Sequence, residues 1–163
     1  MNSRIYSIAV LPGDGIGPEV IQEGLKVLRA VESKLAEIRF EFTEYSVGAG
    51  EYVRSGSPLP VNTLEALKQH AAILLGAMGL PDIRWPDGVE MTPQIDIQEK
   101  LDLYCGLRPV YLYHKDHSPL RSLVRGTIDL LIIREGTEGL FSDRLRKHSL
   151  EANEVCDTRR EHG

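Results

Sequence analysis

Two arginines stand beside apolar runs that are typical of β-strands. Arg108 lies within the run Leu107–Leu112, and Arg134 directly follows the run Ile128–Ile133. A guanidinium at the end of a strand can point into a cleft and bind a carboxylate through two parallel hydrogen bonds. Two structural salt bridges would explain the same residues, so both interpretations stay open at this point. If the arginines act on a ligand, that ligand is an organic acid.

A glycine-rich turn is the second feature that could take part in binding or catalysis. The apolar run Ile5–Leu11 leads into Gly13-Asp14-Gly15-Ile16-Gly17, and Pro18 suits the first position of a helix. Free N–H groups at a helix start favour an anion. The spacing is not that of the dinucleotide fingerprint G-x-G-x-x-G, however, and the carboxylate of Asp14 would repel a pyrophosphate. From spacing alone, a purely structural turn is favoured over an anion site.

Three ordered segments carry a resemblance to a known family. They are Leu11–Val20 (LPGDGIGPEV), Leu101–Pro109 (LDLYCGLRP) and Ile132–Gly139 (IIREGTEG). Together they resemble the β-decarboxylating dehydrogenases of the isocitrate/isopropylmalate/tartrate family, over about residues 5–141. The resemblance implies an α/β fold of the isopropylmalate-dehydrogenase type, with a parallel-rich sheet flanked by helices and incomplete relative to the family. It assigns residues 1–142 to the amino-terminal part of that fold and residues 143–163 to a polar, truncated tail.

The family oxidises 2-hydroxy di- or tricarboxylic acids, such as isocitrate, tartrate or isopropylmalate, and then removes carbon dioxide. It uses NAD or NADP together with Mg²⁺ or Mn²⁺. By resemblance, Arg108 and Arg134 hold the malate-type carboxylates of the substrate. The positions that the family places at the cofactor are Gly15, Ile16, Gly76 and Thr92.

Two residues depart from the family pattern. Gln98 stands where a further carboxylate-binding arginine is expected, and replacing a buried charge-assisted contact would weaken binding by roughly 1.5–3 kcal/mol. Phe141 stands where the family has its catalytic tyrosine, and a phenyl ring cannot transfer a proton. The resemblance therefore predicts altered affinity or substrate choice, and a different proton donor or impaired chemistry.

Thr92 and Gln94 correspond to positions that in the family touch the variable substituent of the substrate. Isopropylmalate enzymes present apolar and acidic groups there, whereas both residues are polar in this chain. We therefore expect a hydrophilic substituent, as in isocitrate or tartrate. The competing interpretation is that both are ordinary residues at the start of a helix.

The family's general-base lysine, its metal-binding aspartates and its main adenine-binding loop follow the region matched here. No catalytic or metal-ligating residue is therefore assigned in this chain, and we expect it to be inactive alone. A chain that binds substrate without catalysis, or pairs with a complete subunit, is the alternative. Such a fragment is also expected to leave a sheet edge and apolar faces uncovered.

The elements that must position these residues follow from hydrophobic periodicity. Strands are expected at residues 5–11, 38–43, 71–75, 107–112 and 128–133, the last of them buried. The fourth is limited to an edge or bend by Pro109. Helices are expected from Pro18 through Leu35, over residues 61–67 and over residues 94–104, with loops at 48–60 and 76–93. Strands alternating with helices indicate a parallel sheet.

Composition limits the remaining possibilities. The chain has 163 residues, 42% of them hydrophobic and 26% charged, which predicts one packed unit. Its net charge of −5 argues against nucleic acid as a partner. The start of the sequence shows no signal peptide or membrane span, and the two cysteines have no disulfide-type spacing, so we expect a cytoplasmic protein. By resemblance, the complete protein would be a homodimer that acts on a small hydroxy acid.

Overall fold

The computed structural model describes residues 3–121, 124 and 126–136. They divide into two compact units, one that ends at Ile97 and one that begins at Gln98. The expectation of a single packed unit is therefore wrong. The predicted boundary between residues 142 and 143 lies outside the described residues.

The first unit is built on a three-stranded parallel sheet in the order β2-β1-β3. Strand β1 (Arg4–Gly13) is central, with β2 (Ile38–Glu44) on one side and β3 (Ala72–Ala77) on the other. Four consecutive residues of β1, Ile8–Leu11, are buried because both of its faces are covered. The predicted parallel arrangement is confirmed for these three strands.

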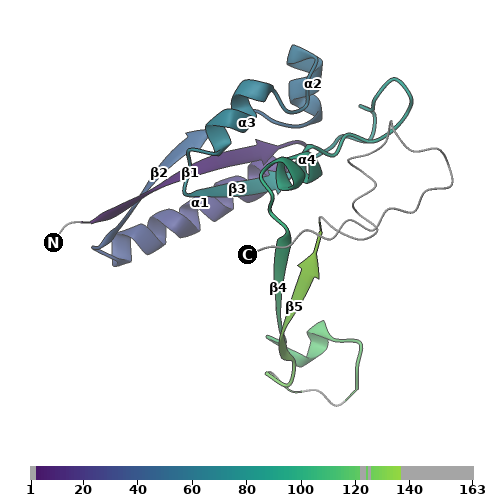
Figure 1. Cartoon of the computed structure of the whole chain (residues 1–163). Coiled ribbons are helices and arrows are strands. Elements are labelled where there is room, and N and C mark those ends of the chain that lie inside the picture. The colour runs from purple at the N-terminus through teal and green to yellow at the C-terminus, as the bar shows by residue number, and fades with distance from the viewer. Residues whose placement is uncertain (1–2, 122–123, 125, 137–163) are drawn as a thin grey trace. The chain divides into compact units, whose positions relative to one another are not determined.

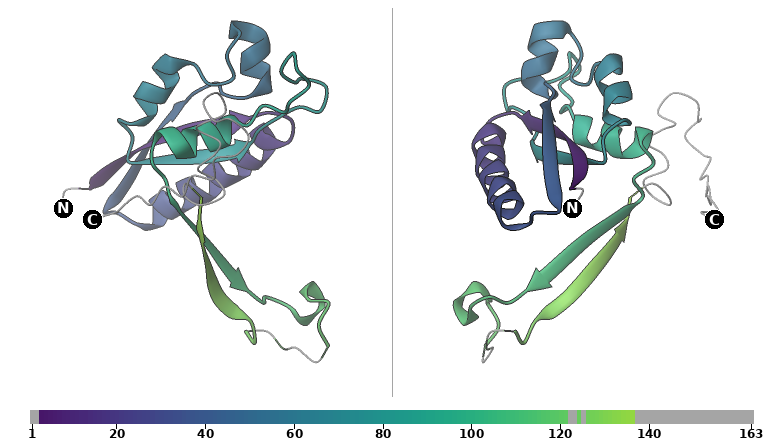
Figure 2. Two further views of the ribbon diagram at one scale, coloured as in Figure 1. Left: turned by 45° about the vertical axis from the view of Figure 1, so that its right-hand side comes forward. Right: turned by 90° about the vertical axis from the view of Figure 1, so that its left-hand side faces the viewer.

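Helices cover both faces of this sheet (Figures 1 and 2). Helix α1 (Gly17–Lys34) lies on one face, and helices α2 (Ala49–Ser55) and α3 (Val61–Leu67) lie on the other. The core beneath α1 joins all three strands and consists of Ile8, Val10 and Ile21, with Tyr6, Leu25, Phe40, Phe42 and Leu74 packed against them. The predicted helical face that contains Ile21 and Leu25 is confirmed.

Helix α2 was not expected, because residues 48–60 were predicted to form a loop. The N–H groups of Ala49 and Gly50, which have no acceptor within the helix, donate hydrogen bonds to the carboxylate of Asp14. Its end is closed by Gly56 in the left-handed region, with φ +82°. The cap lies more than thirty residues away in the sequence, so no local pattern could have revealed the helix.

Helix α4 (Pro93–Lys100) contains the boundary between the units and is shorter than the predicted 94–104. Its last turn is closed by hydrogen bonds from the Asp102 N–H to the Glu99 carbonyl and from the Leu103 N–H to the Gln98 carbonyl. Asp102 adopts φ +53°, which a continuing helix does not permit. The helix therefore ends before the strand that carries Arg108.

The second unit contains an antiparallel pair formed by β4 (Cys105–Tyr111) and β5 (Asp129–Glu135), and a 3₁₀ turn η1 (Lys115–His117) between them. Both predicted strands exist, but the expectation that residues 128–133 are buried is wrong, since every residue of β5 is exposed. A two-stranded ribbon has two open faces, and apolar residues on it stay accessible unless another element packs there. Within the part of the chain that the structure describes, no helix is long and apolar enough to cross a membrane.

Candidate functional site

The turn after β1 is organised around the buried carboxylate of Asp14, which is only 7% exposed. Its Oδ2 accepts hydrogen bonds from the N–H groups of Ala49 at 2.7 Å and Gly79 at 2.8 Å. Its Oδ1 accepts from the N–H of Gly50 at 2.8 Å. One side chain thus joins three segments: the β1–α1 turn, the start of α2 and the loop after β3.

Two glycines make this convergence possible. At Gly48, which has φ +123°, a Cβ would lie 2.3 Å from Oδ2 of Asp14, so any side chain would push the carboxylate away. At Gly76, a Cβ would lie 2.2 Å from the carbonyl oxygen of Pro12 and 3.0 Å from Cγ1 of Ile21. Gly76 therefore lets β3 approach the β1–α1 turn closely, and its predicted contact with a cofactor stays a prediction.

The start of α1 is poorly suited to binding a phosphate. The N–H of Gly17 donates to the carbonyl of Asp14 at 2.8 Å, Pro18 has no N–H, and Glu19 adds a negative charge to the first turn. A pyrophosphate cradle fits poorly here, because the acidic Glu19 lies in the first turn and the N–H groups of positions 17 and 18 are bonded or missing.

Gly15 and Ile16 nevertheless leave an accessible apolar surface at this turn. Ile16 is 63% exposed, and Gly15, with φ +55°, has only Leu80 Cδ2 at 4.0 Å beside the position of a Cβ. A flat, partly apolar group such as a nicotinamide or adenine ring could lie against this surface. These two residues fit one wall of a cofactor site.

The start of α4 contains the residues expected to meet the variable substituent of the substrate. The carbonyl of Thr92 accepts the N–H groups of Ile95 at 2.9 Å and Asp96 at 3.2 Å, so Thr92 stands at the helix start. The Oε1 of Gln94 is buried and has no hydrogen-bond partner among the described residues. A buried acceptor without a donor is costly, so this atom suits a ligand or water that donates a hydrogen bond. Gln98, further along α4, is exposed.

Both candidate arginines lie on the same face of the β4–β5 ribbon. Arg108 pairs with Ile132, and Gly106 pairs with Arg134. Directly opposed residues of an antiparallel pair share a face, and residues two apart in one strand do as well, so Arg108 and Arg134 are diagonal neighbours. Diagonal positions are roughly 7–8 Å apart, a distance that two long guanidinium side chains can span from both sides of one small acid.

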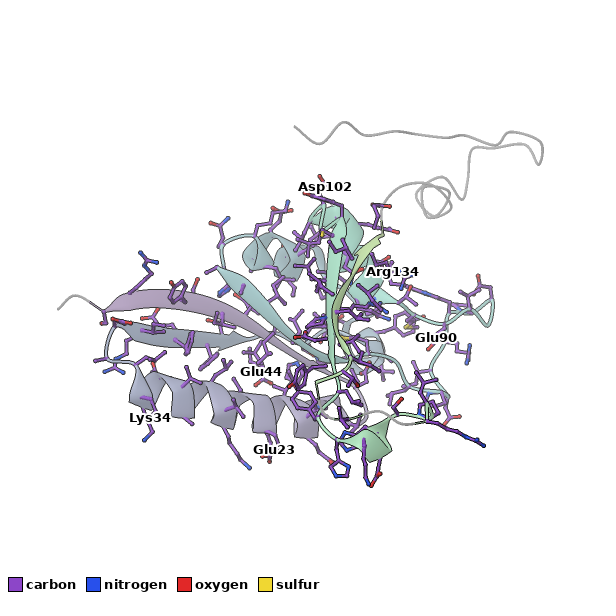
Figure 3. The ribbon with its side chains drawn as sticks, turned by 90° about the horizontal axis from the view of Figure 1, so that it is seen from below. Glu23, Lys34, Glu44, Glu90, Asp102 and Arg134 are labelled. Atoms are coloured by element: carbon purple, nitrogen blue, oxygen red, sulfur yellow. The ribbon has the colours of Figure 1, made fainter. Side chains whose placement is uncertain are left out.

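The ribbon favours this pairing in a second way. Arg134, labelled in Figure 3, stands opposite a residue without a side chain, so no bulky neighbour fills the position across from it. Both arginines are exposed. The structure therefore brings these two predicted residues together within the second unit, while Gly15, Ile16, Gly76, Thr92 and Gln94 belong to the first.

The role of Asp14 was missed by sequence reasoning, which treated its carboxylate as exposed to a ligand. A second buried acid, Glu51, was missed as well. Burial raises the pKa of the Glu51 carboxyl, but hydrogen bonds from Ser46 and Ser55 and the contact with Arg54 at 2.7 Å outweigh burial and hold the pKa below its usual value.

The family's metal ligands and its proton donor are the remaining expected features of the site. Among residues 3–121, 124 and 126–136, no group of three or more His, Cys, Asp or Glu side chains is arranged to hold a metal ion. The described part of the chain thus does not offer a Mg²⁺ or Mn²⁺ site. Phe141 lies outside the described residues.

The fold and the paired arginines define an α/β protein with a parallel β–α–β unit and a separate two-stranded ribbon that carries both arginines. Among solved structures, a β-decarboxylating dehydrogenase from Thermococcus kodakarensis matches with a TM-score of 0.61 and 34% identity, over 83% of this chain and 35% of that chain. An isocitrate dehydrogenase from Methylococcus capsulatus matches with a TM-score of 0.67 at 24% identity, over 84% of this chain and 36% of that chain, which shows the fold alone.

The model of the isocitrate/isopropylmalate dehydrogenase family matches residues 7–161, and the chain belongs to this family. It is 42% identical to a 3-isopropylmalate dehydrogenase from Thermobifida fusca, over 98% of this chain and 46% of that protein. It is 43% identical to a 3-isopropylmalate dehydrogenase from Moorella thermoacetica, over 94% of this chain and 44% of that protein. The chain thus spans less than half the length of these relatives. The family and the fold inferred from the three sequence segments are confirmed.

Proposed function

We propose that this chain supplies the carboxylate-binding residues of a dehydrogenase that oxidises and decarboxylates a 2-hydroxy acid with NAD or NADP and a divalent metal ion. The observation that carries the proposal is the placement of Arg108 and Arg134 as diagonal neighbours on one face of the β4–β5 ribbon. Membership of the isocitrate/isopropylmalate dehydrogenase family supports the reaction class.

The contribution of the chain's own residues is positioning. Each guanidinium would hold a carboxylate through charge-assisted hydrogen bonds and thereby fix the orientation of the hydroxyl-bearing carbon between them. The exposed side chain of Ile16, next to Gly15, would form one wall against the cofactor rings. A bound nicotinamide would supply the hydride acceptor. The described residues offer no metal site, so we assign no step through a metal ion.

The variable substituent of the acid determines which member of this substrate class is bound. The names of the relatives point to an isopropyl group. The buried Oε1 of Gln94 points instead to a substituent that donates a hydrogen bond, such as the hydroxyl of tartrate or a protonated group. We propose the polar substituent, because an isopropyl group offers this acceptor no donor, and an acceptor that no water reaches would stay unsatisfied at a cost of about 1–3 kcal/mol.

Binding of isocitrate, tartrate and isopropylmalate to the full chain, measured by calorimetry, tests both proposals. Substituting Arg108→Gln or Arg134→Gln removes one charge-assisted contact of roughly 1.5–3 kcal/mol, so affinity should fall roughly 10- to 100-fold. Arg39→Gln, at an exposed position of β2, is the matched control and should change nothing. Equal affinity of the variants and the control would refute the arginine clamp. Preferential binding of isopropylmalate would refute only the polar substituent.

A second function, binding without turnover, is favoured by one residue. Phe141 occupies the position of the family's proton-transferring tyrosine, and a phenyl ring has no proton to donate. Reduction of NAD or NADP by this chain with a bound acid and Mg²⁺ would rule out binding without turnover. Binding of acid with no reduced nucleotide would be consistent with both functions, because the chain is expected to be inactive alone.

A further inference from the structure

The pairing of β4 with β5 continues beyond the ends of both strands. The N–H of Gly136 donates to the carbonyl of Tyr104 at 3.1 Å, and at the far end the N–H of Leu112 donates to the carbonyl of Ile128 at 2.9 Å. Both bonds fit the register of the ribbon, so the ladder runs from one bond to the other without a bulge. Tyr104 therefore stands directly opposite Gly136.

Tyr104 lies on the same face of the ribbon as the two arginines. Side chains alternate between the faces along a strand, so Tyr104, Gly106 and Arg108 share one face. Arg134 shares this face because it stands directly opposite Gly106. The order along the face is thus Tyr104, Arg134 and Arg108, with Arg134 diagonal to both of the others. Tyr111, the tyrosine within β4, belongs to the opposite face.

Two glycines leave space between these side chains. Gly106 lies between Tyr104 and Arg108, and Gly136 stands across the ribbon from Tyr104. Four residues of a strand span about 13 Å, so the phenol and the Arg108 guanidinium flank a stretch of backbone that carries no side chain. A Cβ at Gly106 would lie 3.3 Å from the carbonyl oxygen and 3.7 Å from the Cβ of Arg134. Any side chain there would take up the space beside that arginine.

The backbone of Tyr104 is held on both sides. Its N–H donates to the Asp102 carbonyl at 3.0 Å, while its own carbonyl accepts the N–H of Gly136. The N–H of Leu103 donates to the Gln98 carbonyl at 2.8 Å, which ties this segment to the last turn of α4. Because the backbone is already fixed, only the side-chain torsions of Tyr104 remain to be ordered when a ligand binds, and this lowers the entropic cost of binding.

We propose that Tyr104 is a third contact of the bound acid, and that its hydroxyl donates a hydrogen bond to the carboxylate held by Arg134. This inference rests on the proposed function, because it extends the clamp formed by the two arginines. A carboxylate offers about four lone-pair sites, so it can accept a bidentate arginine and a hydroxyl at the same time. An O–H···O⁻ bond is roughly twice as strong as a neutral one. The hydroxyl acts as a hydrogen-bond donor, and no proton transfer is assigned to it.

This contact makes the two ends of the clamp different. Arg134 has the phenol of Tyr104 as a diagonal neighbour and a glycine directly across the ribbon, whereas Arg108 stands opposite the apolar side chain of Ile132. The two carboxylates of a malate-type acid are similar in charge and size, and only one of them is attached to the hydroxyl-bearing carbon. A hydroxyl donor at one arginine alone therefore favours one orientation of the acid over its reverse.

Calorimetry of the full chain with isocitrate, tartrate and isopropylmalate tests the proposal. Tyr104→Phe removes only the hydroxyl and should weaken binding of the acid roughly tenfold, as expected for a hydrogen bond to a charged group. Tyr111→Phe is the matched control, because it removes the same atom from the other face of β4 and should leave the affinity unchanged. Gly106→Val fills the space beside Arg134 and should also weaken binding, whereas Cys105→Val, on the other face, should not.

An ultraviolet difference spectrum gives an independent readout, since binding of the acid should perturb a tyrosine absorption band that Tyr104→Phe loses and Tyr111→Phe keeps. Circular dichroism of each variant verifies that the fold is retained. If Arg108→Gln weakens binding while Tyr104→Phe and Tyr111→Phe bind equally well, the arginine clamp stands and the third contact is overturned. If Arg108→Gln leaves the affinity unchanged, or the wild-type chain binds none of the three acids, the clamp and the third contact both fail.

Discussion

Substituting Asp14→Asn should destabilise the first unit substantially while keeping the size of the side chain. The carboxylate accepts three backbone N–H groups, two at Oδ2 and one at Oδ1. An amide has one oxygen, which can retain the bonds from Ala49 and Gly79. Its NH₂ group then faces the N–H of Gly50, so two donors oppose each other and that bond is lost.

The magnitude follows from these contacts. The Gly50 N–H left without an acceptor costs about 1–3 kcal/mol, and each retained bond weakens by up to about 1 kcal/mol once the acceptor is neutral. A neutral amide is easier to bury than a carboxylate, which offsets part of the loss. We therefore expect a decrease of about 2–4 kcal/mol in the free energy of unfolding, a large share of the 5–15 kcal/mol typical of a domain.

Urea unfolding followed by tryptophan fluorescence measures this change, because Trp85 is the chain's single tryptophan and packs on Tyr52 of α2 with ring centres 5.2 Å apart. Asp87→Asn is the control. The Asp87 carboxylate is exposed and accepts one N–H, that of Val89, at 3.0 Å, so its loss should cost less than about 0.5 kcal/mol. Equal effects of the two substitutions would show that Asp14 does not hold the three segments together.

Two further predictions concern the surroundings of Asp14. Gly48→Ala should destabilise the chain by at least about 1–3 kcal/mol in the same urea assay, because it combines a positive φ with a Cβ placed 2.3 Å from Asp14 Oδ2; a neutral effect would contradict the described packing. Glu51 has a lowered pKa, so its contribution to stability is complete above about pH 4.5 and is lost as the pH falls toward the lower folded-state pKa. The melting temperature of the wild-type chain should therefore fall more steeply on acidification than that of Glu51→Gln, and parallel curves would contradict the assignment.

The sequence was sufficient for those elements whose signals are local. Each of three local patterns predicted an element that the structure contains: the strand–turn–helix of residues 5–35, the alternation in Ile38–Phe42 and the apolar run of residues 71–75. Their faces follow from a periodicity of 2 or 3.6 residues, which short-range sterics impose. The family resemblance added the order of the elements and the two arginines.

The elements that were missed depend on contacts that are distant in the sequence. Helix α2 is capped by Asp14, and a buried acid between two glycines gives no sign of the segment that it will bind. The exposure of β5 depends on the absence of a covering layer in the described part of its unit, although its apolar composition is that of a core strand. Periodicity indicates which residues can be buried; it does not indicate which partner buries them.

The arginine pair shows where sequence and structure complement each other. From their positions in the sequence alone, Arg108 and Arg134 fitted salt bridges as well as a carboxylate clamp, and the family resemblance favoured the clamp. The register Gly106↔Arg134 places them on one face, and a shift of one residue would have placed them on opposite faces. The clamp therefore depends on the ribbon's register and not on the arginines alone. A substitution that leaves both arginines in place but moves the register by one residue should weaken acid binding at least as much as Arg108→Gln does, with no loss of positive charge.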